Sequence, residues 1–438
     1  MSTDIIDLKA KLITDFSAQQ ALLNGKSEGE FSQTKKKAIQ QFESLGFPSA
    51  KHEEWKYSNV KNLIATDYNF SSDHQVTAEL AQEIQIPGLD GNILYFVNGK
   101  YEPSLSQIVS PDSEVTILPL HEAVTAEAAL FNKYFNTIAK TEEEAFTALN
   151  TAFAEQGVFI HVAKGKAVTQ PIVLCYVSDA RQENVGQQPR NLIIVEENAQ
   201  VKVAETFNTI GEERSFTNIV SEIFVAQHAH AEFYKVQNES QNAYHIGTTQ
   251  VQMLDKSHFY SATVTVNGGF VRNNLHIEID GEYCDAYMYG LYIPDGIQHI
   301  DNHTLADHRK ANSISNELYK GVLRDQSKGV FNGKIFVRED AQKTNAYQSC
   351  KNVVLSDGAT MNTKPQLEIF ADDVKCSHGT TTGQLDNEAL FYLRSRGISK
   401  AEAMRLLMFA FCEDVLAQIR IDSIKEHMEA LVSEKLIK

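Results

Sequence analysis

Two side chains that can bind a soft metal stand two residues apart near the end of the chain. Cys376 and His378 follow the alternating apolar run 367–374 and precede a C-terminus of helical character. Side chains of an extended strand repeat with a period of two, so the thiol and the imidazole are predicted to project from one face. Tetrahedral metal and cluster sites usually take four ligands, so a metal bound here needs further ligands from elsewhere in the chain or from a second chain.

The same two residues also have a structural interpretation. Free cysteines are commonly buried as small apolar side chains. A histidine at the end of a strand can simply satisfy neighbouring polar groups. The sequence around Cys376 and His378 leaves both interpretations open.

A second group of histidines lies further upstream. His299, His303 and His308 stand with Asp301 and Asp307 within ten residues. Their spacing matches no standard zinc motif. They form either a metal-binding or functional surface, or a set of side chains that hydrogen-bond to the turns between stacked strands.

The chain carries no recognisable site for ATP hydrolysis. Lys26, Lys166 and Lys334 each follow a glycine, but none completes the GxxxxGK[ST] spacing of a phosphate-binding loop. The Cys376–His378 pair lacks a third residue that would orient the histidine as a catalytic base. We therefore predict that the chain is not an enzyme.

A carbohydrate-active enzyme built on stacked strands is the main alternative class. Its candidate carboxylates are Asp340, Asp357, Asp372 and Asp373. Such enzymes are generally exported, which this chain is not expected to be. A lectin-like or structural solenoid is the third possibility.

The composition is that of a folded, acidic protein. The chain has 438 residues, of which 42% are hydrophobic, and a formal net charge of −17. Nucleic acid and anionic membrane surfaces are not expected partners, because both require a basic surface. No run approaches the roughly 18 apolar residues of a membrane span, and the first residues lack a secretion signal, so we expect a cytoplasmic location. The five cysteines are scattered and odd in number, which indicates reduced thiols.

Helical patterns at both ends of the chain enclose a long β region. Residues 1–155 are predicted to form an N-terminal region that is helical and mixed, and residues 385–438 a C-terminal helical domain. Short β-branched runs dominate the intervening 156–384, which is the predicted β core. Polar turns before these runs fall at Ala199, Ala229, Ser257, Cys284, Ser327 and Gly358, spaced 30, 28, 27, 43 and 31 residues apart by subtraction. This near-period indicates stacked repeats in a β-solenoid or a long β-sandwich, and is too uneven to separate the two.

A strongly apolar helix is predicted after Ser399, whose hydroxyl and the carboxylate of Glu402 have the form of a capping box. Its apolar stripe either packs on the end of the β core or binds another protein. The partner-binding candidates on it are Met404, Leu407, Met408 and Phe411.

A long collinear series of motifs resembles the SufB/SufD family of iron-sulfur cluster assembly proteins, on its SufD branch. The resemblance is dense between about 299 and 400, and Gly379 after the histidine is typical of that branch. One departure is Ala311–Ser315, where many such chains read Pro-His-Cys-Thr-Ser. The matching runs are 53–57, 316–323, 329–337, 341–344, 355–359, 362–369, 372–379 (Asp-Asp-Val-Lys-Cys-Ser-His-Gly) and 390–397.

The resemblance implies a mainly β fold with a right-handed parallel β-helix between helical ends. It implies a complex with a SufB-like subunit and with the ABC-type ATPase SufC, which the C-terminal helices would contact. It further implies that His378, with Cys376 as an accessory, contributes to a transient iron-sulfur cluster shared with the SufB-like subunit. A bound flavin and a homodimer of isolated chains are left open.

Overall fold

The computed structural model describes residues 7–22, 29–71 and 84–437. The segment on which the absence of a secretion signal was judged lies outside these residues. Among the helices described, none is long and apolar enough to cross a membrane.

The core consists of two long sheets, here called sheet A and sheet B, whose strands pair in parallel through most of the stack. Consecutive strands alternate between the sheets, so that the chain winds into a β-solenoid of about eight turns. The predicted mainly β fold with a parallel β-helix is therefore confirmed. The strands are mostly eight to eleven residues long. They are longer than the apolar runs of the sequence because they also include polar residues whose side chains face the interior.

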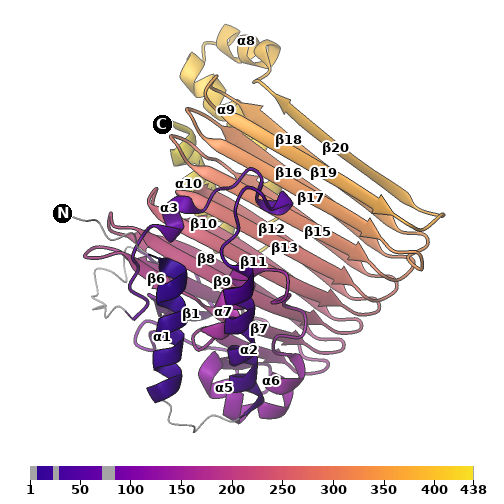
Figure 1. Ribbon diagram of the computed structural model, residues 1–438. Helices are drawn as coiled ribbons and strands as arrows, with labels where there is room; N and C mark the ends of the chain where they lie inside the picture. The colour runs from indigo at the N-terminus through magenta and orange to yellow at the C-terminus, as the bar shows by residue number, and fades with distance from the viewer. Residues whose placement is uncertain (1–6, 23–28, 72–83, 438) are drawn as a thin grey trace.

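The strand bounds follow the stacking order of Figure 1. Sheet B contains β2 (Lys100–Tyr101), β1 (Asn92–Val97), β5 (Ile172–Asp179), β8 (Gln200–Ile210), β10 (His230–Asn238), β12 (His258–Asn267), β14 (Asp285–Tyr292), β16 (Ile314–Leu323), β18 (Asn345–Val354) and β20 (Lys375–Gly383). Sheet A contains β3 (Thr116–Pro119), β4 (Val158–Val162), β7 (Arg190–Val195), β9 (Ser215–Val225), β11 (Ala243–Met253), β13 (Phe270–Ile279), β15 (His299–His308), β17 (Lys328–Val337) and β19 (Thr360–Ile369), with β6 (Val185–Gln187) paired to β9.

One corner of the solenoid explains the uneven turn spacing. A non-glycine residue with positive φ stands there in six successive coils, 30, 28, 27, 29 and 31 residues apart by subtraction. The predicted anchors Ser327 and Gly358 belong instead to the opposite corner, before β17 and β19, which is why the sequence pattern showed a gap of 43. The six residues of the first corner are Asn198, His228, Lys256, Tyr283, Asn312 and Lys343.

Helices of the N-terminal region cover the outer face of sheet A (Figure 1). Phe42 and Trp55 pack there with Phe216 and Phe270 of the sheet. The helix Ala128–Tyr134 ends before Asn136, which has a φ of 59°. The helices are α1 (Leu8–Leu22), α2 (Glu30–Leu45), α3 (Lys61–Ile64), α5 (Leu120–Ala126), α6 (Ala128–Tyr134) and α7 (Ala145–Ala152), with a 3-10 turn at Glu53–Trp55.

Two C-terminal helices, α9 (Lys400–Leu416) and α10 (Asp422–Ile437), pack on the outer face of sheet B. The Ser399 hydroxyl accepts a hydrogen bond from the Glu402 amide, which is one half of the predicted capping box, whereas the Glu402 carboxylate pairs with Arg405. A third helix, α8 (Asn387–Ser395), projects beside the end of the strand ladder (Figure 1). The division into three domains stays a prediction, because β1 and β3 of the N-terminal region also extend the two sheets.

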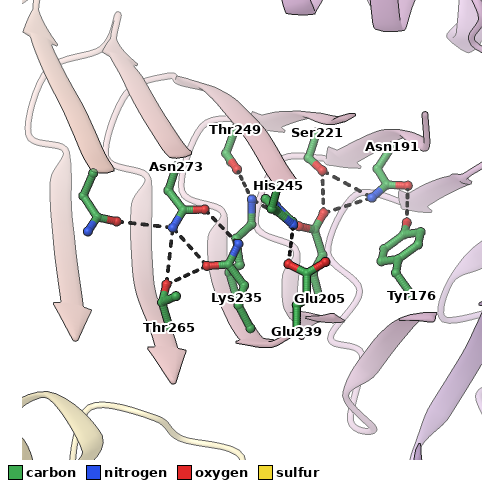
Figure 2. Close-up of polar contacts among 12 residues, drawn as sticks. Tyr176, Asn191, Glu205, Ser221, Lys235, Glu239, His245, Thr249, Thr265 and Asn273 are labelled. Carbon is green, nitrogen blue, oxygen red and sulfur yellow. Dashed lines mark hydrogen bonds and ion pairs between the residues drawn. The ribbon is translucent and has the colours of Figure 1, made fainter. Parts of the chain in front are cut away.

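The interior of the solenoid is apolar on one side and polar on the other. Buried charged groups face one another there: Lys235 Nζ lies 3.5 Å from Glu205 Oε2, and His245 Nδ1 lies 2.8 Å from Glu239 Oε2. Such burial is tolerable because each group faces a partner, and the other oxygen of Glu205 accepts hydrogen bonds from Asn191 and Ser221. Figure 2 shows two separate groups of these polar contacts, one joining Tyr176, Asn191 and Ser221 and one joining Thr265 and Asn273.

Candidate functional site

The solenoid is open at its last coil. Sheet A ends at β19 and sheet B at β20, and no further coil of the described chain covers them. Their interior-facing side chains are therefore half-buried or exposed, whereas those of the coils beneath are buried. This end presents an unfinished core together with two free strand edges, which is a template for pairing with another chain.

Cys376 and His378 lie together on this open end. In β20 they are in register with Ala346 and Gln348 of β18, both of which face the interior and are buried. The two side chains therefore point into the open coil from one strand face, as predicted. Cys376 is half-buried and packs against the small buried cluster that includes Ile335 and Ala346, and His378 is exposed.

The thiol of Cys376 is protonated in its present surroundings. Partial burial raises its pKa, so a metal that binds the sulfur must displace a proton. Thiolate sulfur and imidazole nitrogen are both ligands of iron in iron-sulfur centres. Among the residues that the structure describes, no three His, Cys, Asp or Glu side chains come together to hold a metal. Cys376 and His378 thus provide two donors, which are too few to complete a metal site.

The strand edges differ in how far they are protected. The Thr360 and Phe370 amides of β19 bond back to β17 and its flanks, so the amides of the odd-numbered residues between them point outward. Pro365 occupies one of these outward positions and lacks the donor. In β20 the Lys375 amide bonds back to Thr344, which leaves the even-numbered amides, those of Cys376 and His378 included, on the free edge.

A column of polar side chains lies beneath His378. Glu317 of β16 and Gln348 of β18 precede it in the same interior row. Gln348 Nε2 donates to Glu317 Oε2 over 2.8 Å. Burial raises the pKa of Glu317 to about 7, although the nearby side chains of Thr304 and Gln348 act on it in the opposite direction.

The upstream histidines do not converge on one site. Ile300 and Ala306 of β15 belong to the interior cluster, so His308 faces inward while His299 and His303 face outward. His308 lies 2.9 Å from the Ser315 hydroxyl, and His299 Nε2 lies 2.9 Å from the Ser58 hydroxyl. The hydrogen-bonding interpretation fits, but the partners of the outward histidines lie in the N-terminal region and on sheet A itself, and not in the turns.

The segment 53–57 straps the N-terminal region to the outer face of sheet A. The Arg272 guanidinium lies 3.9 Å from the Trp55 ring centroid, and Arg272 Nη1 donates to the Glu54 carbonyl over 2.7 Å. A hydrogen bond from His303 lowers the pKa of Glu54 to about 2. Glu53 pairs with Lys364 of β19 at 2.7 Å, so the strap reaches the last coil.

The partner-binding candidates on α9 lie mostly against their own β core. Met408 is only 4% exposed and packs on sheet B, with Met404 and Phe411 half-buried beside it. Leu407 is half-buried as well. On α8 and α9 the large apolar side chains left exposed are instead Phe391, Tyr392 and Leu406, at 73%, 57% and 38%.

Comparison with known families covers nearly the whole chain. The model of the SUF system FeS cluster assembly SufBD core domain matches residues 176–411, and that of the SufBD protein N-terminal region matches residues 6–174. The chain belongs to the SufBD family. It is accordingly an iron-sulfur cluster assembly protein of the SUF system.

Curated SufBD proteins align over most of their length. An iron-sulfur cluster assembly SufBD family protein of Synechocystis is 30% identical over 428 residues, which is 96% of this chain and 94% of the relative. Iron-sulfur cluster assembly protein SufD of Escherichia coli is 29% identical over 400 residues, 91% of each chain. SufD of Bacillus subtilis is 27% identical over 414 residues, 91% of this chain and 92% of the relative.

Sequence reasoning missed Glu317 and Gln348 as part of this SufBD site. A signal for them exists, because Glu317, Gln348 and His378 are separated by 31 and 30 residues by subtraction, which is the length of one coil. Once the repeat is known, residues one coil apart are neighbours. The uneven spacing of the predicted turn positions hid this relation in the sequence.

Proposed function

We propose that this chain is one half of a two-subunit scaffold on which an iron-sulfur cluster is assembled, with His378 as its ligand and Cys376 as an accessory donor. The observation that carries the proposal is the pair of soft donors at an open coil, with too few neighbours to complete a site. The SufBD family membership supports the cluster as cargo. A cluster held by donors from two chains can be released when the chains move apart.

A SufB-like subunit is the proposed occupant of the open end. It would cover the interior-facing side chains of β19 and β20 and supply the missing ligands. Pairing along the free edge of β20 would give the contact a fixed register, since its outward amides have no partner in the described chain. No reaction is proposed for this chain alone, and a flavin is not part of the proposal.

The ABC-type ATPase SufC is the proposed partner of the C-terminal helices. Phe391 and Tyr392 of α8 and Leu406 of α9 offer the exposed apolar surface such a contact needs. Leu407 and Met404 lie beside it as half-buried contributors. Met408 and Phe411 act by holding α9 on sheet B.

Iron and acid-labile sulfide, measured on the complex reconstituted with a SufB-like subunit and SufC, test the cluster assignment. His378→Ala should leave the complex assembled but lower both contents several-fold, because one ligand is lost. Thr382→Ala, on the same open strand face, is the matched control and should keep the wild-type contents. Undiminished iron and sulfide in His378→Ala would refute the role of His378.

A further inference from the structure

We propose that Gln348 and Glu317 form a buried positioning column that orients His378, with Gln348 Oε1 accepting the N–H of one ring nitrogen. The other ring nitrogen is then left with its lone pair facing the open end. This inference deepens the proposed function and rests on it for its consequence in cluster assembly. The orientation itself concerns this chain alone.

The column is set by strand register. Glu317, Gln348 and His378 occupy equivalent positions in β16, β18 and β20, which pair in parallel. Side chains stacked in this way stand about 4.8 Å apart, the spacing of neighbouring strands. Glu317 and Gln348 are 2% and 3% exposed, so the only open place in the row is that of His378.

Two buried acceptors in this column have no partner. Gln348 donates its Nε2 to Glu317, while Gln348 Oε1 and Glu317 Oε1 are buried without a hydrogen-bond partner. Leaving a buried acceptor unsatisfied is unfavourable. The imidazole one strand above Gln348 carries the nearest N–H in the row that can satisfy its oxygen.

The position of the Gln348 amide is restricted from the opposite sheet as well. Gly333 of β17 faces it, and a Cβ at Gly333 would lie 2.3 Å from Gln348 Nε2. The absence of a side chain there makes room for the amide. Glu317 thus holds the nitrogen end of the Gln348 amide beside Gly333, which leaves the oxygen end for another partner.

The arrangement suits a histidine that serves as a metal ligand. Such a histidine usually donates its second ring N–H to a carbonyl or carboxylate, which fixes the tautomer and the ring orientation. Gln348 would supply that carbonyl here, and Glu317 would keep the amide from turning over. In this account Gln348 and Glu317 are positioning residues and do not touch the cluster.

The ring-nitrogen chemical shifts of His378 in the full chain, labelled with 15N-histidine, test the orientation without any metal. The resonances are assigned by their loss in His378→Gln. The wild type should show one dominant neutral tautomer. Gln348→Leu should give the mixed tautomers of a free imidazole, as should Glu317→Leu, whereas Glu317→Gln should restore the wild-type shifts because an amide oxygen still accepts from Gln348.

Asn352→Leu is the matched control, since Asn352 is equally buried in β18 and stands two interior rows away, beneath Thr382. It should leave the tautomer unchanged. Wild-type shifts in Gln348→Leu, or an equal change in Asn352→Leu, would overturn the column. A different result would contradict the proposed function but not the column: the tautomer responds as described, while the iron and sulfide content of the complex is the same in wild type and His378→Ala.

Discussion

At the scale of single residues, the open end depends on which polar groups are buried and which are left free. His378 is exposed and Glu317, two strands beneath it, is sealed in the interior. Burial favours the neutral carboxylic acid, so Glu317 gains a proton in the folded chain at a pH where it would be ionised in the unfolded chain. This difference has a measurable effect on stability.

The free energy of unfolding of the wild type should fall relative to that of Glu317→Gln as pH rises from about 4.5 to about 7. The pKa of Glu317 is raised from 4.5 to about 7, so the folded state binds the extra proton and loses stability as that proton leaves. The full difference is about 3 kcal/mol. Chemical denaturation of both proteins between pH 4 and pH 8 measures it.

Neighbouring groups do not titrate in that window. Burial raises the pKa of Cys350 to about 11 and that of Tyr319 further still, so both stay neutral. Thr304 and Gln348 carry no charge. A constant difference between wild type and Glu317→Gln across this range would show that the carboxyl is not buried as described.

The sequence identified His378 and Cys376 because their spacing within one strand is visible in one stretch of chain. It did not identify Glu317 and Gln348, because their relation to His378 depends on strand register between coils. The upstream histidines show the converse relation: His299, His303 and His308 are close in sequence, yet strand alternation places His308 on the opposite face.

At the scale of elements, the strap at residues 53–57 holds the N-terminal region on sheet A. Trp55 is buried between Phe146 and Arg272, with ring centroids 5.4 Å apart in the aromatic pair. Removing the indole would leave a cavity over the buried Arg272–Asp301 ion pair. The strap is thus expected to contribute to stability and to support the last coil through Lys364.

Trp55→Ala should lower the free energy of unfolding by about 3 to 5 kcal/mol, the usual cost of truncating a buried Trp. Denaturant titration measures the loss. Lys56→Ala, at the exposed neighbouring position, should change stability by less than about 0.5 kcal/mol. A loss below about 1 kcal/mol in Trp55→Ala would mean that the strap is only loosely attached.

Helix types and the β core could be predicted from patterns within each element, such as the capping box at Ser399. Whether the apolar stripe of α9 packs on its own β core or binds another protein could not be predicted. Met408 serves the fold because sheet B offers an apolar outer face built from strands far away in sequence. An apolar stripe that packs on its own core and one that binds a partner have the same sequence pattern.

At the scale of the whole molecule, the β-helix is closed on its sides by helices and open at its last coil (Figure 1). The free edge of β20 is the place where a second chain can continue the sheet. Alternate residues of this edge strand donate either to β18 or outward, which allows the two directions to be tested separately.

Thr380→Pro should weaken association with a SufB-like subunit at least tenfold while leaving the fold intact, because it removes an outward amide and places the ring on the free edge. Thr381→Pro is the contrasting variant and should lower stability, since its amide points to β18. Binding titration and thermal unfolding report the two effects. Wild-type affinity in Thr380→Pro would exclude pairing along β20.

The most direct measurement of the central claim is pulsed electron paramagnetic resonance on the reduced, cluster-bearing complex, with only this chain labelled with 15N-histidine. A strongly coupled 15N nucleus should be observed, and it should vanish in a His378→Gln complex that still carries a cluster. Absence of 15N coupling in the wild-type complex, or its persistence in His378→Gln, would contradict the assignment of His378 as the ligand that this chain contributes.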